Sequence, residues 1–334
     1  MATSVLGLDV GGANLKAAHG GTARVRPFAL WKNPAGLADA LRGLLRDLPA
    51  FDRLAVTMTG ELCDCFESKR QGVHAILDAV AAVAGGAAVR VWRNDGRFVD
   101  LATAHNAPLQ AASANWLALA TFAGRHAPAG PAVLLDIGST TTDVVPLRDG
   151  RPVPKGRTDP ERLDCSELVY TGARRTPLCA LLGVEAAAEF FATTLDAYLL
   201  LGLLPEDAAD RDTADGRPAT RAAAHARLAR MLCADVETST AGRREELALR
   251  VLQKQVHQIG FAVERVVKRL PGPAFTLITA GSGEFLVGPM LRQQRFLGHE
   301  LRPGKIVSLG EILGPAVSAA ACAHAVGVLA AEEM

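Results

Sequence analysis

The chain has 334 residues, of which 49% are hydrophobic and 21% are charged, a composition typical of a globular protein with one large domain or two average ones. Its 36 basic residues balance its 35 acidic residues and leave a net charge of +1. This balance, with only 5% aromatic residues, argues against a nucleic-acid partner held by a basic field or by base stacking.

The cysteines and the hydropathy indicate neither secretion nor a membrane span. No two of the six cysteines form a C-x-x-C pair, and six cysteines in a chain of this length do not make a disulfide framework. The most apolar stretch, residues 315–331, is interrupted by His324 and is shorter than the ~20 residues that cross a bilayer. The first residues carry no signal-peptide pattern. We therefore expect a cytoplasmic protein with reduced thiols, a buried C-terminal helix and no membrane partner.

Strands and helices alternate along the predicted secondary structure, which places the protein in the α/β class. In the first part, the expected strands are residues 4–9, 14–19, 24–30, 54–59 and 89–92, and the expected helices are 37–48, 73–83 and 111–122. From residue 131 the pattern begins again with strands at 132–136 and 142–147. Helices are then expected at 186–201, 221–233, 243–270 and 311–331, with a polar loop at 205–218 and a strand at 275–279.

Three predicted turns carry residue types that suit phosphate. The first follows Asp9, which ends a strand, where a carboxylate can hold Mg²⁺ directly or through water. Glycines there let backbone N–H groups approach phosphate oxygens, and a lysine can neutralise phosphate charge. The residues concerned are Gly11, Gly12, Asn14 and Lys16. An ordinary hairpin with a surface lysine explains this turn equally well when it is taken alone.

The second turn repeats this arrangement with hydroxyl groups in place of the lysine. Asp136 ends the strand and Asp143 follows the turn, so both carboxylates suit a metal ion. Amide and hydroxyl donors for phosphate lie between them, at Gly138, Ser139, Thr140 and Thr141.

The third turn, Gly281, Ser282 and Gly283, follows the strand at 275–279. Its glycines allow a flat group to lie against the backbone.

The order of these turns resembles the acetate and sugar kinase, Hsp70 and actin superfamily. In that superfamily two ribonuclease-H-like lobes surround a phosphate-binding cleft, two loops begin with Asp-x-Gly, and a later glycine turn holds adenosine. The resemblance implies a first lobe at residues 1–130 and a second at 131–334. It also implies a helical insertion at about 186–270 and an adenosine-type turn at 278–284.

More specific strings narrow the resemblance. They are TMTGELCD at residues 57–64, KRQGV at 69–73, NDG at 94–96, ANWLA at 114–118, ELVYTG at 167–172, RTP at 175–177 and TADGR at 213–217. With residues 7–16, these strings resemble the hydantoinase/oxoprolinase-related proteins of tetrahydromethanopterin-linked C1 transfer, whose archaeal relatives are methanofuran-biosynthesis synthases. The similarity covers most of the chain.

The resemblance implies a transferase for methanofuran or methylofuran biosynthesis. Such an enzyme joins an aminomethylfuran-methyl diphosphate to the phenol oxygen of a tyramine- or tyrosine-derived acceptor, so that an aryl ether forms and diphosphate leaves. Mg²⁺ is the expected cofactor, held by Asp9, Asp136 and Asp143, and this reading does not require ATP. The partners are then small molecules.

The substrates suggest further site residues. A free phenol has a pKa near 10, so a base must remove its proton, and Glu61 is the first candidate beside the catalytic Asp9 and Asp136. We expect Lys69 to contact the diphosphate. The paired Arg174 and Arg175 suit an acceptor carboxylate. Asn94 and Asp95 are expected to line the cleft, although a plain β-turn explains them equally well.

Other functions remain open at this stage. The turn at 281–283 keeps an ATP-dependent small-molecule kinase as the first alternative. ATP-coupled amide hydrolysis is a second, although the chain is short for such an enzyme. A nucleotide-switched scaffold without catalysis is a third. The predicted long helix at 243–270 suits either a core or a homo-oligomer interface.

Overall fold

The computed structural model describes residues 4–272, 274–296 and 301–333. Its first sheet has the strand order β3-β2-β1-β4-β5-β6. β1 pairs antiparallel with β2 and parallel with β4, and β4 pairs parallel with β5. The strands are β1 (Val5–Val10), β2 (Asn14–His19), β3 (Thr22–Pro27), β4 (Arg53–Met58), β5 (Ala88–Trp92) and β6 (Phe98–Val99).

The second sheet repeats the pairing pattern of the first. Its order is β10-β8-β7-β11-β12, where β7 pairs antiparallel with β8 and parallel with β11, and β9 pairs with β8. The strands are β7 (Pro131–Ile137), β8 (Thr142–Arg148), β9 (Arg151–Pro152), β10 (Leu168–Val169), β11 (Thr276–Ala280) and β12 (Lys305–Ser308). Two lobes with the same ribonuclease-H-like topology confirm the predicted fold class.

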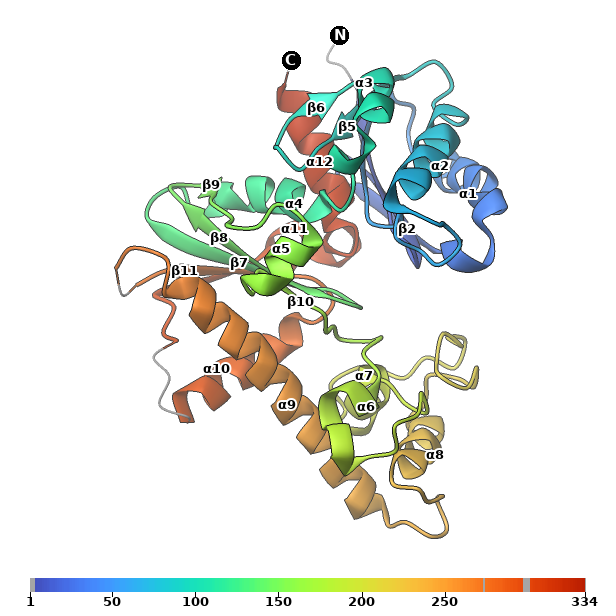
Figure 1. The fold of residues 1–334 in the computed structure, drawn as a ribbon, viewed down its shortest axis with the longest axis vertical. Coiled ribbons are helices and arrows are strands. Elements are labelled where there is room, and N and C mark those ends of the chain that lie inside the picture. The colour runs from blue at the N-terminus through green and yellow to red at the C-terminus, as the bar shows by residue number, and fades with distance from the viewer. Residues whose placement is uncertain (1–3, 273, 297–300, 334) are drawn as a thin grey trace.

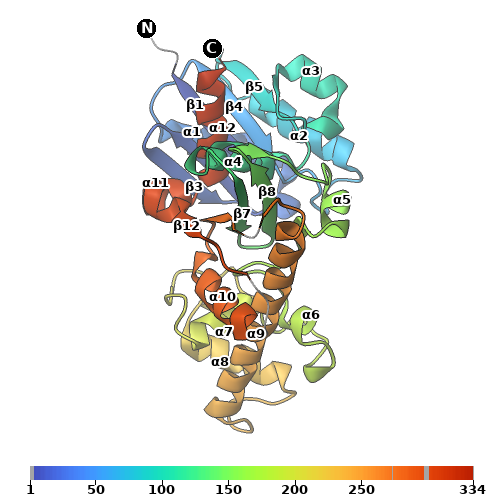
Figure 2. The ribbon, with the colours of Figure 1, turned by 90° about the vertical axis from the view of Figure 1, so that its left-hand side faces the viewer.

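Two helices fill the space between the sheets. α4 (Asn115–Ala123) and α12 (Ala321–Glu332) pack against each other, and α12 also packs on β1, β4 and β2 (Figures 1 and 2). One apolar core unites Ala55 of β4, Leu134 of β7 and Val326 of α12. A side chain at Gly7 would overlap the backbone of Ala323, so glycine is required where α12 crosses β1. The last helix of the chain therefore belongs structurally with the first sheet.

The remaining helices flank the sheets or form a separate arm. α1 (Leu37–Arg46), α2 (Lys69–Ala81) and α3 (Leu101–Asn106) belong to the first lobe, and α5 (Asp159–Asp164), α10 (Val287–Phe296) and α11 (Leu309–Ser318) to the second. The arm contains α6 (Leu178–Leu182), α7 (Thr194–Leu200), α8 (Arg221–Met231) and much of the long α9 (Ala241–Val267), and it extends away from both sheets (Figure 2). Single 3-10 turns occur at Leu30–Lys32, Pro34–Gly36, Pro108–Gln110, Gly124–His126, Gly183–Glu185 and Glu284–Leu286.

The arm has its own core and its own buried ion pair. Leucines of α6, α7, α8 and α9 form a separate apolar cluster. Arg227 and Asp196, both without exposed side-chain surface, pair at 2.7 Å. The arm thus has a core of its own, while α9 also packs on β7 and β8 of the second sheet.

Three predicted helices differ from the structure, and the one expected at 111–122 begins only at Asn115. The helix expected at 186–201 begins only at Thr194, because Thr193 and Asp196 form a capping box that starts α7 there. The helix expected at 311–331 is broken, since Gly314 has a φ of 72° and Pro315 follows it. A second break, at residues 319–320, separates α11 from α12, and the two helices meet there at a bend of 100°. No single described helix is long and apolar enough to cross a membrane, although this bent pair passes a test of length and composition taken together.

Candidate functional site

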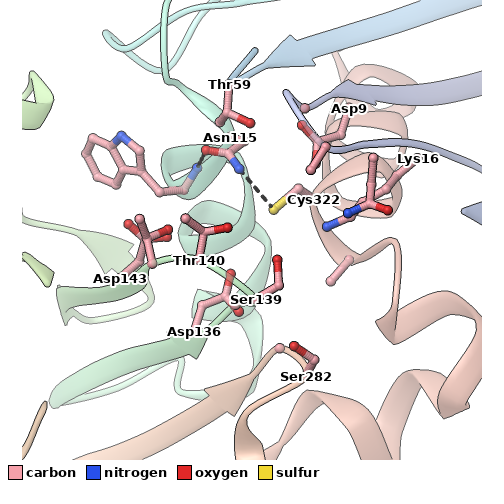
Figure 3. A pocket seen from close by; sticks show the side chains of 18 of the residues that line it. Asp9, Lys16, Thr59, Asn115, Asp136, Ser139, Thr140, Asp143, Ser282 and Cys322 are labelled. Carbon is pink, nitrogen blue, oxygen red and sulfur yellow. Dashed lines mark hydrogen bonds between the residues drawn. The ribbon is translucent and has the colours of Figure 1, made fainter. Parts of the chain in front are cut away.

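A pocket of about 690 Å³ opens between the two lobes (Figure 3). Both Asp-Gly turns, the turn at 281–283, the segment before α4 and the break between α11 and α12 contribute to its wall. The sequence-predicted residues that line it are Asp9, Gly11, Gly12, Asn14, Lys16, Asp136, Gly138, Ser139, Thr140, Thr141, Asp143, Arg174, Gly281 and Ser282. The fold thus brings together three turns that lie far apart in the sequence.

The first turn, phosphate loop 1 (residues 9–16), is a tight hairpin between β1 and β2. The N–H of Gly11 donates to the carbonyl of Asn14 at 3.1 Å, and the N–H of Leu30 donates to the carbonyl of Gly12 at 2.9 Å. The β register sets Asp9 directly opposite Lys16. The hairpin therefore presents a carboxylate and an ammonium group side by side at one wall of the pocket.

Phosphate loop 2 (residues 136–143) has the same backbone frame. The N–H of Gly138 donates to the carbonyl of Thr141 at 2.9 Å, and the register sets Asp136 opposite Asp143. Gly172 packs so closely beneath this loop that a side chain there would overlap Ser139 and Thr140. In Figure 3, Asp136, Ser139 and Thr140 lie across the pocket from Asp9 and Lys16.

Loop 2 needs a counter-charge for its two carboxylates. Burial and then the charge of Asp143 raise the pKa of Asp136 to about 7. Arg162, which is 1% exposed, donates to Asp143 at 2.7 Å and to the carbonyl of Glu167 at 2.9 Å. The Arg162 guanidinium also lies 4.0 Å from the centre of the Trp116 ring, a cation–π contact. Arg162 and Trp116 both line the pocket.

Lys16 supplies positive charge to loop 1. Burial acts to lower its pKa, but the negative charge of Asp9, followed by those of Cys322 and Asp136, outweighs burial, so its pKa is raised and it stays protonated. Burial likewise raises the pKa of Asp9, against the influence of Lys16. Asp9 Oδ1 is buried without a hydrogen-bond partner in the described part of the chain. The pocket therefore combines a protonated lysine with a carboxylate oxygen that remains available.

The third turn packs on the end of β7. Gly281 has a φ of 89°, and a side chain there would overlap Ile137 and the Asp136 carboxylate. The N–H of Gly283 donates to the carbonyl of Ile137 at 2.8 Å, so Gly283 anchors the turn without lining the pocket. Gly281 and Ser282 do line it. The glycines of this turn are thus required by packing against Ile137 and Asp136, and two of its three residues face the pocket.

Glu61 lies behind the pocket wall rather than on it. Its side chain has no exposed surface, and its Oε1 accepts a hydrogen bond from Ser113 Oγ at 2.6 Å. Ser113 itself lines the pocket. Burial raises the pKa of Glu61. A base at Glu61 would reach a substrate only through Ser113.

Three other predicted residues lie beside the pocket. Lys69 Nζ pairs with Asp159 of α5 at 3.3 Å, which joins the first lobe to the second. Asn94 accepts at its backbone carbonyl from Arg157 of the second lobe at 3.0 Å. Asp95 pairs with Arg93, a neighbour on its own turn. None of the three lines the pocket, so the structure gives them contacts between and within the lobes.

The predicted arginine pair is engaged by the arm. Arg174 pairs with Asp210 at 2.7 Å, and Arg175 pairs with Asp212 at 2.6 Å. Their backbone N–H groups donate to the carbonyl of Ser139 at 3.0 and 2.9 Å. Of the two, only Arg174 lines the pocket. The pair therefore ties the arm to phosphate loop 2.

The predicted site residues did not include several residues that line the pocket, namely Thr59, Ser113, Asn115, Trp116, Arg162 and Cys322. Thr59, Asn115 and Trp116 lie in strings that carried the family resemblance but were given no role in the site, whereas Ser113, Arg162 and Cys322 carried no signal. Asn115 Nδ2 donates to Cys322 Sγ at 3.7 Å, a contact between residues 207 positions apart (Figure 3). Gly314 and Pro315 were the available sign that the predicted C-terminal helix is broken before it reaches Cys322.

The donor set suits a cation that is shared with a phosphate. No group of three or more His, Cys, Asp or Glu side chains within the described residues is arranged to hold a metal ion. Mg²⁺, however, usually takes one or two carboxylates and completes its shell with water and substrate phosphates. The unpartnered Oδ1 of Asp9 and the crowded carboxylates of Asp136 and Asp143 fit that mode of binding.

The two ribonuclease-H-like lobes, with an Asp-x-Gly loop on each side of the pocket, form a fold of the acetate and sugar kinase, Hsp70 and actin type. Comparison with known proteins defines the family: residues 52–294 match the model described as Hydantoinase/oxoprolinase, and the chain belongs to that family.

Two archaeal relatives share the name "(4-{4-[2-(gamma-L-glutamylamino)ethyl]phenoxymethyl}furan-2-yl)methanamine synthase". The protein of Methanocaldococcus jannaschii is 31% identical over 321 residues, which cover 92% of this chain and 95% of the relative. The protein of Methanococcus vannielii is 30% identical over 210 residues, which cover 60% of this chain and 91% of the relative.

Among solved structures, a PilM-PilN type IV pilus biogenesis complex matches with a TM-score of 0.52 and 15% identity, covering 99% of both chains. At that identity the likeness supports the fold alone.

Proposed function

We propose that this protein is a transferase of methanofuran or methylofuran biosynthesis that joins an aminomethylfuran-methyl diphosphate to a phenol. The relatives' name describes a product in which a phenoxy oxygen is bonded to the methylene carbon of a furan ring. Synthesis of such a product requires an aryl ether bond. The observation that carries the proposal is a pocket with two facing phosphate loops in a chain that matches these synthases nearly end to end.

The two loops supply what departure of diphosphate needs. A furan-methyl carbon is a benzylic-type centre, so its bond to oxygen breaks with cation character while negative charge gathers on the diphosphate. Lys16 and the amide and hydroxyl donors of loop 2 face into the pocket and would stabilise that charge. A fold that grips the terminal phosphates of ATP in its superfamily would here grip a diphosphate.

Mg²⁺ fits the carboxylates at the loops. Asp9 and Asp136 would hold it, with Asp143 beside them, and the ion would supply further charge for the leaving diphosphate. Asp143 is already paired with Arg162, so we assign Asp9 and Asp136 the larger share.

The experiment that tests the proposal omits ATP. Purified protein is incubated with Mg²⁺, the furan-methyl diphosphate and a tyramine- or tyrosine-derived phenol, and mass spectrometry follows the ether and released diphosphate. We expect both products in equal amounts. We also expect inorganic diphosphate to compete with the furan substrate, because both would occupy the same loops. An absence of ether with every phenol offered would refute the transferase.

The turn at Gly281 and Ser282 favours one second candidate, an ATP-dependent small-molecule kinase, because this turn faces the same pocket. In the same assay, this candidate predicts no ether without ATP, and phosphate transfer to a small molecule when ATP is added. Nucleotide binding without any turnover would instead indicate a switched scaffold.

A further inference from the structure

We propose that Ser113 takes the proton of the phenolic acceptor and passes it to the buried Glu61. This inference rests on the proposed function and adds the route of the proton. Ser113 Oγ lines the pocket and donates to Glu61 Oε1 at 2.6 Å. A hydroxyl that donates one hydrogen bond still has lone pairs with which to accept another. Ser113 is therefore placed to accept the phenol O–H from the pocket side.

The surroundings of Glu61 do not explain it as a structural residue. It has no exposed surface, and its Oε2 is buried without a hydrogen-bond partner among the residues that the structure describes. An unpaired buried oxygen on a carboxyl group is costly. The charged groups near Glu61 are Lys69, which lowers its pKa, and Asp159, which raises it. The thiol of Cys63 is a further titratable neighbour.

The backbone of Ser113 adds an independent sign. Its φ is 48°, in the left-handed region that only a few per cent of non-glycine residues occupy. Such strain costs on the order of 1–3 kcal/mol and gathers at functional sites. The strained backbone sits between the helical turn Pro108–Gln110 and α4, and its side chain bridges Glu61 and the pocket. Glycine or asparagine is the usual residue at such a φ. The presence of a serine here is therefore best explained by a function of its hydroxyl group.

The step balances as follows. The phenol proton moves to Ser113 Oγ while the proton of Ser113 moves to Oε1 of Glu61, which accepts it as an ionised carboxylate. The phenolate oxygen forms the bond to the furan-methyl carbon, and the bond from that carbon to the diphosphate oxygen breaks, its electron pair leaving with diphosphate. The proton on Glu61 returns to solvent after the product leaves. Ser113 contacts the substrate, whereas Glu61 acts through Ser113 and is a positioning residue that also stores the proton.

The test compares two phenols in the complete reaction. One is the ordinary tyramine-derived phenol, and the other is its ring-fluorinated analogue, which is already ionised at the assay pH. Ser113→Ala should lower kcat for the ordinary phenol by about 10²-fold or more, as loss of general-base catalysis does. With the ionised phenol it should lower kcat by less than about 10-fold, because no proton remains to be moved. Glu61→Gln should show the same contrast, with KM for the furan diphosphate little changed.

The chain offers a matched control at Ser166, a second serine with positive φ, at 63°. Its hydroxyl accepts from Arg265 at 2.9 Å, and it does not line the pocket. Ser166→Ala should leave both rates unchanged. Equal losses for the two phenols in Ser113→Ala, or no loss with either, would overturn the relay. Wild-type protein that makes no ether with either phenol would overturn the proposed function instead, so the two failures are distinct.

Discussion

The two phosphate loops share one backbone and differ in charge. Each has an Asp at the end of its first strand, a Gly two residues later and a hydrogen bond from that Gly to a carbonyl three residues on. At the position opposite the Asp, loop 1 has Lys16 and loop 2 has Asp143. Loop 1 therefore balances its own charge, whereas loop 2 depends on Arg162 from α5. The shared loop backbone positions an Asp side chain at the pocket in each lobe. The residue opposite that Asp, Lys16 or Asp143, decides the charge that the lobe contributes to the pocket.

The dependence of loop 2 on Arg162 predicts the largest effect. Arg162→Met leaves Asp143, whose side chain is only 13% exposed, without its partner, and breaking a largely buried pair costs about 3–5 kcal/mol in the free energy of unfolding. Urea unfolding measures this loss. Adding Asp143→Asn should recover much of it, because the unpaired charge is then gone.

Arg42, whose pair with Asp39 is exposed on α1, provides the control for that experiment. Arg42→Met should cost about 1 kcal/mol or less. If Arg162→Met costs no more than this control, loop 2 does not depend on α5 in the way the comparison requires.

The lysine of loop 1 predicts the next effect, this time on activity. Lys16→Met removes a cation that the diphosphate would contact, and loss of one such group slows catalysis by about 10²–10³-fold. Inhibition by inorganic diphosphate should weaken in the same variant. Initial rates of ether formation measure both. Lys32→Met, at an exposed position outside the pocket, should have no effect, and equal rates in the two variants would assign the diphosphate to loop 2 alone.

The carboxylate of loop 2 predicts a dependence on pH. Burial raises the pKa of Asp136 from 3.8 to about 7, so the folded state holds a proton that the unfolded state releases between these values. The free energy of unfolding should therefore fall as pH rises from about 4 to about 7, by at most about 1.4 kcal/mol per pH unit, and then level off. Asp136→Asn should remove this fall in chelator-treated protein.

Binding of Mg²⁺ should change in the opposite direction, because only the ionised carboxylate attracts the cation. In wild-type protein the Mg²⁺ concentration for half-maximal activity should decrease as pH rises through about 7. Chelation should abolish activity, and added Mg²⁺ should restore it. A pH response that survives in Asp136→Asn would place the titrating group elsewhere.

The sequence predicted the two phosphate loops well because the residues that define each loop are neighbours in the chain. Hydrophobic strands that end in Asp and a glycine turn are contiguous, and α9 confirms the expected long helix between 243 and 270 to within a few residues. The fold class followed from the order of these motifs. Such features depend on neighbours in the chain, which a single sequence displays.

What the sequence did not predict depends on contacts between distant residues. The charges of Lys69 and Arg175 suited anionic substrate groups. In the structure, however, Lys69 forms an ion pair with Asp159 and Arg175 forms one with Asp212, which both lie far along the chain. Ser113 and Cys322 have no motif of their own and reach the pocket through a strained turn and a broken helix. Helix periodicity also missed the late start of α7, where the capping of Thr193 outweighs helix propensity.

The contacts that hold the loops face to face predict the smallest effect. Lys69 and Asp159, each 26% exposed, join the lobes beside the pocket, and partly exposed pairs contribute about 1 kcal/mol or less. If Lys69 only sets the separation of the lobes, Lys69→Met and Asp159→Asn should each change KM for the furan diphosphate a few-fold, and the double variant should do no more than either. Lys254→Met, which breaks a similarly exposed pair with Glu185 outside the pocket, is the matched control.

If Lys69 instead binds the diphosphate, as its sequence context predicts, Lys69→Met alone should raise KM for the furan diphosphate about tenfold or more, while Asp159→Asn should not. Ether-forming kinetics of these four variants would thus decide whether the charge that faces the diphosphate comes from loop 1 alone or is shared with the start of α2.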